Sequence, residues 1–472
     1  MGSPSTRPLK VDVAVIGGGV VGCAVARRLS LDGASTVLVE KGPDILHGAS
    51  KGNSAILHTG FDAPPGSLEH QCVRNGYEEY LSIHTGLNLP VRHTGAMVTA
   101  WSGEEEDKFE AIMEKGRKNG IRDLQLLTRD QILAREPHLS SHVRMAILVP
   151  GESIVDPWSA PLAYLNQSVA NGGRLWANAE VFGGDFDGDK WLLNTRKGPV
   201  EASFVINCAG LFGDELDRRC RGKSKFVIKP RKGQFVVFDK VASRLLNTII
   251  LPVPTARTKG IVLFPTIFGN LVVGPTAEEQ ESREDASVDQ GILESLKSQA
   301  IEKIPELFQA QVTTTYAGIR PATEKAHYRI DEDYDRNWIT LGGIRSTGLT
   351  GALGLASFVS GLVDGRSRGF VPLENPLVPR VPNLAEDRPR DYGTPGYKEV
   401  VGHCEMVTQR EIEAALEGPL AAGSLAGLKR RTRATMGRCQ GFYCSARLAE
   451  LTRGKFDAPL GKCGCKKDEN NG

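Results

Sequence analysis

Alternating apolar and polar stretches along the chain predict an α/β protein in which strands and helices follow one another. The β-branched run at 10–16 has the length of a buried strand, and the apolar-rich stretch at 20–31 has that of a helix. A second short strand is expected at 36–40. This order of strand, helix and strand is typical of a doubly wound sheet of parallel strands.

Two kinds of strand are expected further along the chain. Residues 202–208 have the unbroken apolar character of a buried strand, whereas 232–240 and 260–276 alternate as antiparallel strands do, with 268–270 as a hairpin tip. We expect the alternating strands to form the mixed sheet of a separate domain. Other helices are expected at 67–83, 104–119, 157–170 and 348–363, and other strands at 94–100, around Val181 and Trp191, at 312–320 and at 338–343.

The turn between the first strand and helix has the spacing G-x-G-x-x-G, with Gly17, Gly19 and Gly22 at the glycine positions. Glycine there allows a sharp turn, a close approach of the backbone to a pyrophosphate, and tight packing of helix against strand. The N-terminus of the helix adds a partial positive charge. Glu40 follows Gly22 by eighteen residues, where an acid binds a ribose hydroxyl. These features predict a dinucleotide site; a glycine-rich turn in an ordinary βαβ unit is the alternative.

Two later stretches extend the predicted site. Residues 48–60 are rich in small and hydrogen-bonding side chains, which let the backbone lie against a large flat ligand. Residues 202–213 form a second junction of strand, glycine turn and helix, where a doubly wound sheet again meets its ligand.

The charge balance gives no reason to expect a nucleic-acid partner. Lys and Arg number 58 and Asp and Glu number 56, so the net charge is only +2. No apolar run reaches the ~18 residues of a transmembrane helix, and the N-terminus lacks the apolar core of a secretory signal. A cytoplasmic protein is therefore expected.

Six prolines in 370–396 predict a linker, placed at 376–396. Beyond it we expect a compact basic module at 397–450 and a flexible tail at 451–472. Because disulfides are rare in a reducing compartment, the late cluster of cysteines predicts a metal site. Five of the nine cysteines belong to this part of the chain: Cys404, Cys439, Cys444, Cys463 and Cys465.

Further motifs follow in a fixed order: G-N-S-A-I-L-H-T-G-F-D-A-P-P-G-S-L from Gly52, I-V-D-P-W from Ile154, N-C-A-G-L-F-G-D-E-L from Asn207, P-R-K-G-Q-F from Pro230, K-G-I-V-L-F-P-T from Lys259 and G-N-L-V-V-G-P-T-A-E from Gly269. In this order they resemble the FAD-dependent oxidoreductases of the D-amino-acid oxidase superfamily, and within it the flavin subunit of anaerobic-type glycerol-3-phosphate dehydrogenases. The H-T-G stretch also resembles L-2-hydroxyglutarate dehydrogenases. Residues 404–444 resemble the small 2Fe–2S domain of the bacterioferritin-associated-ferredoxin type.

The resemblance implies FAD and a set of contacts for it. The glycines at 17–22 are expected at the pyrophosphate, Glu40 at the adenosine ribose, and 348–350 at the pyrimidine end of the flavin above a helix N-terminus. The full expected set is Gly17, Gly18, Gly19, Val20, Val21, Gly22, Glu40, Lys41, Ser50, Asn53, Ser54, Val181, Ala209, Gly210, Gly348, Leu349 and Thr350.

His58 and Arg320 are the expected catalytic residues. His58 lies in the presumed flavin loop, where a neutral imidazole suits proton removal from an alcohol; ordering the loop by hydrogen bonds is the alternative. Arg320 stands in G-I-R-P, where the resemblance implies an anion-binding guanidinium; a structural ion pair is the alternative. Substrate contacts are expected from His58, Arg320 and Lys259, and an ordinary surface loop is the other interpretation of Lys259.

Two features depart from the family pattern. Arg345 and Ser346 precede G-L-T where relatives carry an acid and then serine and proline, which puts a basic residue beside the flavin. In the late module, Gly402 stands where the family has a cysteine, so Cys404, Cys439 and Cys444 remain as metal ligands. An iron–sulfur cluster takes four ligands. His403, Cys463 or Cys465 is the candidate for the fourth; a vestigial module without a cluster is the alternative.

The sequence thus predicts an α/β enzyme with a small C-terminal helical module of iron–sulfur type. An FAD-dependent oxidoreductase is expected at 10–375. Its doubly wound cofactor domain comprises 10–93, 146–225 and 315–368, and its mixed-sheet substrate domain comprises 94–145 and 226–314.

The resemblance implies oxidation of a small anionic secondary alcohol. The first candidate substrate is sn-glycerol 3-phosphate, whose oxidation product is dihydroxyacetone phosphate. An L-2-hydroxy-acid dehydrogenase or amino-acid oxidase is one alternative, and a non-catalytic flavin electron-transfer subunit is another. The expected electron acceptor is a quinone or a redox partner subunit, with peripheral rather than transmembrane association if a membrane is involved.

Overall fold

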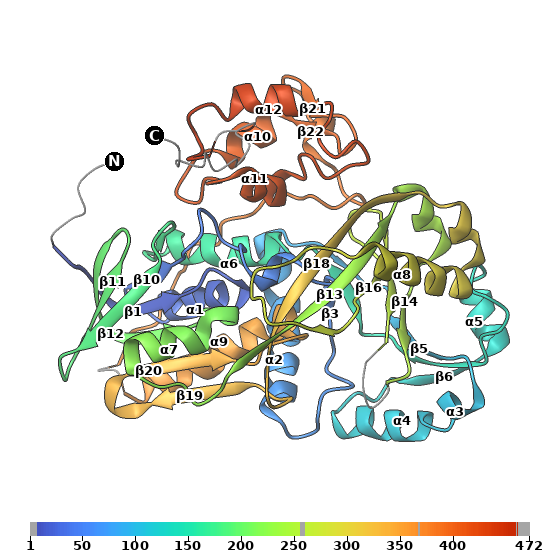
Figure 1. The fold of residues 1–472 in the computed structure, drawn as a ribbon, viewed down its shortest axis with the longest axis horizontal. Coiled ribbons are helices and arrows are strands. Elements are labelled where there is room, and N and C mark those ends of the chain that lie inside the picture. The colour runs from blue at the N-terminus through green and yellow to red at the C-terminus, as the bar shows by residue number, and fades with distance from the viewer. Residues whose placement is uncertain (1–6, 255–259, 367–368, 459, 461–472) are drawn as a thin grey trace, which may run out of the picture. The chain divides into compact units, whose positions relative to one another are not determined.

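Strand β1 (Leu9–Ile16) lies at the centre of a mostly parallel sheet (Figure 1). It pairs in parallel with β12 (Gly198–Asn207) on one side and β2 (Thr36–Val39) on the other. Parallel pairing continues from β2 to β9 (Arg174–Trp176) and from β12 to β20 (Trp338–Gly342). Every residue of β2 and β20 is buried, which explains the unbroken apolar runs. The predicted α/β fold is confirmed.

Antiparallel strands extend this sheet. β11 (Trp191–Thr195) pairs with β12, β10 (Val181–Phe186) pairs with β11, and β19 (Arg329–Asp333) pairs with β20. They lie outside the parallel core, where a hairpin connection suffices.

Four helices pack together beside the parallel strands. Helix α1 (Val20–Leu31) contacts α6 (Ser159–Ala170) and α9 (Gly348–Asp364), and α9 contacts α2 (Leu68–Leu87) (Figure 1). Helices α1 and α9 begin at the predicted residues. Helix α6 begins at Ser159 rather than 157, because the Asp156 carboxylate accepts the N–H of Trp158 at 2.9 Å and of Ser159 at 3.0 Å.

A second sheet has antiparallel pairs except between β14 and β5, which are parallel, so the predicted mixed sheet is confirmed. It packs on α8 (Gln290–Lys303) through an apolar core that includes Phe238, Leu263 and Leu296. The strands in spatial order are β17 (Glu278–Glu279), β13 (Ile228–Phe238), β16 (Leu271–Gly274), β15 (Val262–Pro265), β14 (Ile249–Pro252), β5 (Ala96–Ala100), β7 (Met145–Val149) and β6 (Gln125–Thr128).

Strand β18 (Val312–Thr323) also belongs to the second sheet. It pairs antiparallel with β13, from Val312 opposite Phe238 to Thr323 opposite Ile228. The expected boundary between residues 314 and 315 assigns most of β18 to the cofactor domain. In the structure β18 belongs to the substrate sheet instead, because its backbone groups bond to those of β13. Arg320 therefore lies opposite Arg231.

A small sheet brings together segments far apart in sequence. β3 (Ile56–Leu57) and β4 (Val91–Arg92) both pair antiparallel with β8 (Ser153–Val155). Leu57 lies opposite Ser153, so the residues that follow Leu57 meet those that precede Ser153.

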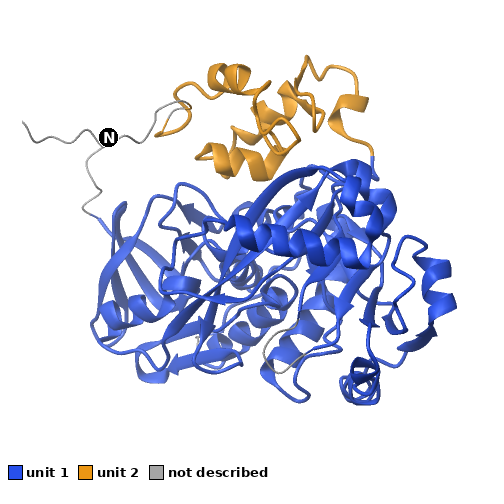
Figure 2. Cartoon of the chain, turned by 45° about the vertical axis from the view of Figure 1, so that its right-hand side comes forward, with its two compact units in different colours: residues 1–388 blue, residues 389–472 orange. Residues whose placement is uncertain are grey.

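The computed structural model describes residues 7–254, 260–366, 369–458 and 460, in two units, 1–388 and 389–472 (Figure 2). The first part of the expected linker, 376–396, belongs to the first unit. Val381 N–H donates to the Leu87 carbonyl and Glu386 N–H to the Ile267 carbonyl, both at 3.1 Å, and Leu384 is buried. Prolines remove strand periodicity from this segment, but its remaining N–H groups still find partners.

The second unit folds around an apolar core that includes Val407, Ile412 and Leu428. Phe456 packs into that core, although the flexible tail was expected from 451; residues 459 and 461–472 lie outside the described part. The elements of this unit are β21 (Val400–Gly402), β22 (Val407–Thr408), α10 (Gln409–Ala415), α11 (Leu425–Thr432) and α12 (Ser445–Leu451).

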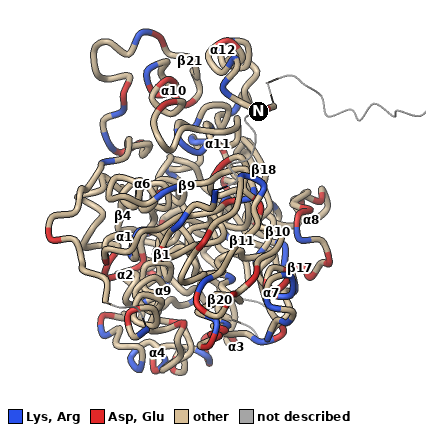
Figure 3. Tube along the Cα trace, turned by 90° about the vertical axis from the view of Figure 1, so that its left-hand side faces the viewer, with Lys and Arg blue, Asp and Glu red and all other residues tan. Residues whose placement is uncertain are grey.

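Acidic and basic residues are intermixed along the chain in Figure 3. Among the described helices, none has the length and apolar character needed to cross a membrane. The remaining helices are α3 (Gly103–Glu106) and α4 (Phe109–Lys118), into which the helix predicted at 104–119 divides, α5 (Arg129–Arg135) and α7 (Gly213–Arg221).

Candidate functional site

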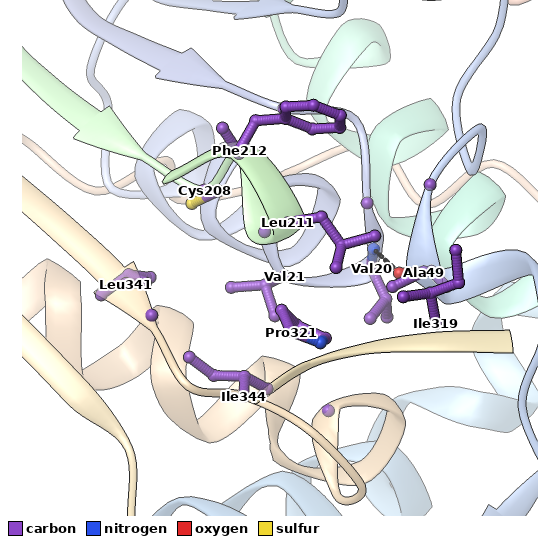
Figure 4. Close-up of a pocket in the computed structure, with 18 of the residues that line it drawn as sticks. Val20, Val21, Ala49, Cys208, Leu211, Phe212, Ile319, Pro321, Leu341 and Ile344 are labelled. Atoms are coloured by element: carbon purple, nitrogen blue, oxygen red, sulfur yellow. Dashed lines mark hydrogen bonds between the residues drawn. The ribbon is translucent and has the colours of Figure 1, made fainter. Parts of the chain in front are cut away.

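A cavity of about 390 Å³ lies at the carboxyl ends of the parallel strands. Ile16 of β1, Val39 of β2 and Leu341 of β20 contribute to its wall, together with Cys208, which follows β12. Figure 4 shows Leu341, Cys208 and labelled side chains from other segments around one space. Ligands of doubly wound sheets bind at this edge, so the cavity lies where the fold predicts a site.

The glycine turn forms one side of the cavity. Gly17 has a φ of +108°, and a Cβ atom on Gly22 would lie 1.9 Å from the Gly17 carbonyl oxygen. Only glycine therefore allows α1 to start this close to the end of β1. At the start of α1, Val20 N–H donates to Ser50 Oγ at 3.1 Å, which ties the turn to the 48–56 loop.

Glu40 lines the cavity, but its carboxylate also braces the backbone. Oε2 accepts the Gly18 N–H at 2.6 Å and Oε1 accepts the Gly42 N–H at 2.7 Å. These two contacts hold the glycine turn against the end of β2, a role that the spacing of Glu40 alone did not indicate.

Lys41 joins two further parts of the wall. Its ammonium lies 3.4 Å from the centre of the Phe212 ring and 3.2 Å from Glu284 Oε1. A cation over an aromatic face is attractive, so Lys41 draws the turn after β12 and the loop after β17 toward the end of β2.

Most of the expected cofactor residues are brought together. Gly18, Gly22 and Thr350 are not in the cavity wall but adjoin residues that are. The expected residues in the wall are Gly17, Gly19, Val20, Val21, Glu40, Lys41, Ser50, Asn53, Ser54, Val181, Ala209, Gly210, Gly348 and Leu349.

His58 is not in the cavity wall, but it follows Ile56 of the wall by two residues and bonds to Thr350, which follows Leu349 of the wall. Its backbone N–H donates to Thr350 Oγ1 at 3.0 Å. Its ring Nδ1 lies 2.8 Å from Glu152 Oε2, and the side chain remains 21% exposed. The ring, two residues along the chain from Ile56 of the cavity wall, is thus held by Glu152 with part of its surface exposed.

Glu152 was not singled out from the sequence. It is fully buried, and its Oε1 accepts the N–H of Thr59 at 2.7 Å and the Thr59 hydroxyl at 2.8 Å. No local pattern marks it, because G-E-S is an ordinary turn sequence. The pairing of β3 with β8 brings it to His58.

Arg320 lies in the cavity wall, partly buried, and its Nη2 donates to the Thr276 carbonyl at 2.7 Å. A Cβ atom on Gly233, across the β13–β18 pair, would lie 2.3 Å from that Nη2, so glycine makes room for the guanidinium. Burial, followed by the charges of Arg231 and Arg345, lowers the pKa of Arg320 to about 10. Within the described residues it forms no ion pair with a carboxylate at 4.0 Å or less.

Arg345 is another cation in the cavity wall, and its Nη2 donates to the Ala326 carbonyl at 2.6 Å. It lies in the loop between β20 and α9, and its closeness to the flavin stays a prediction. Lys259, the third expected substrate contact, lies outside the described residues.

The three cysteines of the second unit do come together. Cys404, Cys439 and Cys444 surround a hollow of about 10 Å³, room for about one water molecule, with Gly402 and His403 in its wall. The N–H groups of Tyr443, Gly441 and Phe442 lower the pKa of Cys439, whereas burial raises that of Cys404 and Cys444.

This hollow does not by itself fit an iron–sulfur cluster. Three thiols face it, Gly402 supplies none, and a cluster takes four ligands. Among the residues that the structure describes, no group of three or more His, Cys, Asp and Glu side chains is placed to hold a metal ion. Cys463 and Cys465 lie outside the described residues.

Comparison with known proteins supports the same fold and cofactor. A family model described as FAD dependent oxidoreductase matches residues 12–362. A glycerol 3-phosphate dehydrogenase of Caloramator mitchellensis is 30% identical over 93% of both chains, a match that extends into the second unit. An L-2-hydroxyglutarate dehydrogenase of Caenorhabditis elegans is 26% identical over 66% of this chain and 74% of its own. The solved structure of L-α-glycerophosphate oxidase from Mycoplasma pneumoniae with FAD bound is 26% identical, with a TM-score of 0.72, over 79% of this chain and all of that one.

Proposed function

Because this chain belongs to the FAD-dependent oxidoreductase family, we propose that it oxidises a small anionic secondary alcohol at FAD bound in the 390 Å³ cavity. The proposed substrate is sn-glycerol 3-phosphate, and the product is dihydroxyacetone phosphate. The names of the similar dehydrogenase and oxidase support this choice. The main support for this substrate is the Arg320 guanidinium, which lies in the cavity wall and forms no ion pair with a carboxylate of the described residues.

The donor set of the cavity fits FAD. Gly17 and Gly19 present bare backbone to it, and a Cβ atom on Gly19 would already lie 3.2 Å from Ser50 Oγ. Helices α1 and α9 both begin at the wall, so two positive helix ends suit a pyrophosphate and an anionic ring. Each oxygen of Glu40 keeps a second lone pair for a ribose hydroxyl. Bound FAD supplies the acceptor for the hydride that leaves the substrate carbon.

His58 is the proposed acceptor of the hydroxyl proton. Oxidation of an alcohol to a ketone removes that proton as well as a hydride, and imidazole is suited to accept it near neutral pH. The hydrogen bond from the His58 backbone N–H to Thr350 Oγ1 fixes the His58 backbone to the residue that follows Leu349 of the cavity wall.

Arg320 is the proposed anion ligand. A guanidinium binds phosphate or carboxylate through two parallel hydrogen bonds, and the charges of Arg231 and Arg345 add to the positive field. A substrate carboxylate would accept the same two hydrogen bonds from Arg320. Oxidation of an L-2-hydroxy acid is therefore the second candidate function, favoured by the similarity to an L-2-hydroxyglutarate dehydrogenase.

Anaerobic reduction of the flavin by a substrate panel tests the proposal. Glycerol 3-phosphate should bleach the flavin bands faster than L-2-hydroxyglutarate, glycine or proline at equal concentration. A faster response to L-2-hydroxyglutarate would select the second candidate. If dithionite bleached the flavin but no compound of the panel did, the protein would be a flavin subunit that only transfers electrons.

We propose that electrons leave to a quinone or a redox subunit, and that the protein is cytoplasmic with peripheral membrane association. A cluster in the second unit would use Cys404, Cys439 and Cys444 and a ligand from beyond the described residues. The described hollow does not fit a complete cluster, so no electron route is assigned through it.

A further inference from the structure

We propose that Glu152 is a positioning residue that holds His58 in the tautomer with the proton on Nδ1, so that Nε2 accepts the proton of the substrate hydroxyl. This inference rests on the proposed function for its catalytic consequence. The assignment of the tautomer stands on the local geometry alone.

The direction of the bond follows from the hydrogen-bond partners of Glu152. Oε1 already accepts two hydrogens from Thr59, from its N–H at 2.7 Å and its hydroxyl at 2.8 Å. The Thr59 hydroxyl in turn accepts the N–H of Phe61 at 3.4 Å, so its own hydrogen is directed at Glu152. A carboxylate so surrounded by donors acts as an acceptor at Oε2 as well. His58 Nδ1, 2.8 Å away, must therefore donate, and a neutral ring then carries its lone pair on Nε2.

The backbone around Glu152 keeps this carboxylate in place. Its carbonyl accepts the N–H of Gly95 at 2.9 Å, and the neighbouring Gly151 carbonyl accepts the Tyr77 hydroxyl at 2.8 Å. Burial and the Glu152 charge both raise the pKa of Tyr77, which keeps that hydroxyl a donor. Because Glu152 is fully buried, it cannot reach the substrate, and its effect passes through His58.

Substitution by glutamine distinguishes positioning from mere support. Glu152→Gln preserves the volume of the side chain. The two Thr59 donors require the amide oxygen on their side, which turns the amide NH₂ toward His58 Nδ1. Nδ1 must then accept, so the proton moves to Nε2 and the ring can no longer accept a proton from substrate.

The first measurement is the nitrogen NMR spectrum of the FAD-loaded protein labelled at histidine, with the His58 signal identified by its loss in His58→Asn. We expect the Nδ1–H tautomer in the wild type and the Nε2–H tautomer in Glu152→Gln. An Nε2–H signal in the wild type would overturn the assignment, and this arm remains decisive if the variant does not fold. An unchanged tautomer in a folded Glu152→Gln protein would overturn it as well.

The second measurement is anaerobic flavin reduction by glycerol 3-phosphate. Glu152→Gln should lower the limiting rate by about 10²- to 10⁴-fold, with the half-saturating concentration within about threefold because Arg320 is untouched. Glu136→Gln is the matched control, since Glu136 is equally buried and accepts the N–H groups of Asn247 and Thr248 away from the cavity. A limiting rate in Glu152→Gln equal to that of Glu136→Gln would overturn the role of Glu152. If no substrate reduces the wild-type flavin, the proposed function fails, while the NMR result still decides the tautomer.

Discussion

Arg283 Nη1 lies 2.5 Å from Asp214 Oδ1 and joins the loop after β17 to helix α7. Asp214 is fully buried and also accepts the Ile228 N–H at 3.1 Å. Burial on its own would raise the pKa of Asp214, but the hydrogen bonds from Arg283 and Ile228 and the nearby positive charges lower it below the usual 3.8. The cofactor sheet and the substrate sheet are thus connected by a contact that requires an ionised carboxylate.

We predict that Arg283→Met weakens the fold in a pH-dependent way. A folded-state pKa below the unfolded one stabilises the protein above the usual Asp value, and this stabilisation is lost as the pH falls through the folded value. At pH 7 the free energy of unfolding should fall by about 3 kcal/mol. The difference from wild type should persist at pH 5 and shrink as the pH falls below 3.8, as measured by urea unfolding from pH 7 downward.

Arg144→Met is the control for this prediction, because Arg144 pairs with Glu106 at an exposed site. Its loss should cost less than about 1 kcal/mol. Equal losses in the two variants would show that burial of Asp214 does not matter.

Gly19→Trp should abolish FAD binding. The indole would fill the space in front of the α1 N-terminus, where the Cβ atom alone already lies 3.2 Å from Ser50 Oγ. The purified variant should lack the flavin absorbance bands while keeping the circular dichroism of the wild type. Gly103→Trp is the control, because a Cβ atom on Gly103 meets nothing within 4 Å. A yellow Gly19→Trp protein would refute the assignment of the pyrophosphate site.

Arg320→Met should weaken substrate binding more than it slows the reaction. Hydrogen bonds to a charged group contribute about 1.5–3 kcal/mol, so the half-saturating concentration of glycerol 3-phosphate should rise roughly 10- to 100-fold. Arg244→Met, at an exposed arginine, provides the control. Titration of flavin reduction with substrate separates the two parameters. An unchanged half-saturating concentration would place the anion site elsewhere.

His58→Ala should lower the limiting rate of flavin reduction by about 10²- to 10⁴-fold, because the hydroxyl proton loses its acceptor. FAD content should stay at the wild-type level, since the His58 side chain is not part of the cavity wall. Stopped-flow absorbance measures the rate, and His142→Ala, at an exposed histidine, is the comparison. Wild-type rates in His58→Ala would leave loop ordering as the role of this residue.

A chain that ends at Leu460 should hold no 2Fe–2S cluster. It keeps Cys404, Cys439 and Cys444, but Gly402 offers no fourth ligand and a cluster takes four. Iron and acid-labile sulfide should be measured in this chain and in the full-length protein, both purified without oxygen. Full cluster content in the shortened chain would exclude Cys463 and Cys465 as ligands and leave His403 as the candidate. Iron absent from both chains would indicate a vestigial module.

Local patterns of the chain determine a large part of the fold. The predicted bounds of strand β1, the glycine turn and α1 agree closely with the structure, because each element depends on backbone preferences within about thirty residues. Gly17 and Gly22 have to be glycine for reasons of turn and close packing, and the structure confirms both reasons. The family resemblance implies a place at the site for Arg320, and Arg320 does lie in the cavity wall.

Tertiary structure decided what surrounds these residues. Glu152 is 94 positions from His58, and only the pairing of β3 with β8 brings its carboxylate to the ring. The register of β18 with β13 brings the Arg320 guanidinium to the space that Gly233 leaves. The packing of 376–388 within the first unit depends on N–H groups that carry no pattern of their own. The sequence by itself therefore determined the fold class and the glycine turn, since both are written in neighbouring residues. The partners of His58, Glu40 and Arg320 were decided by the tertiary structure, since contacts between distant strands leave no local signal.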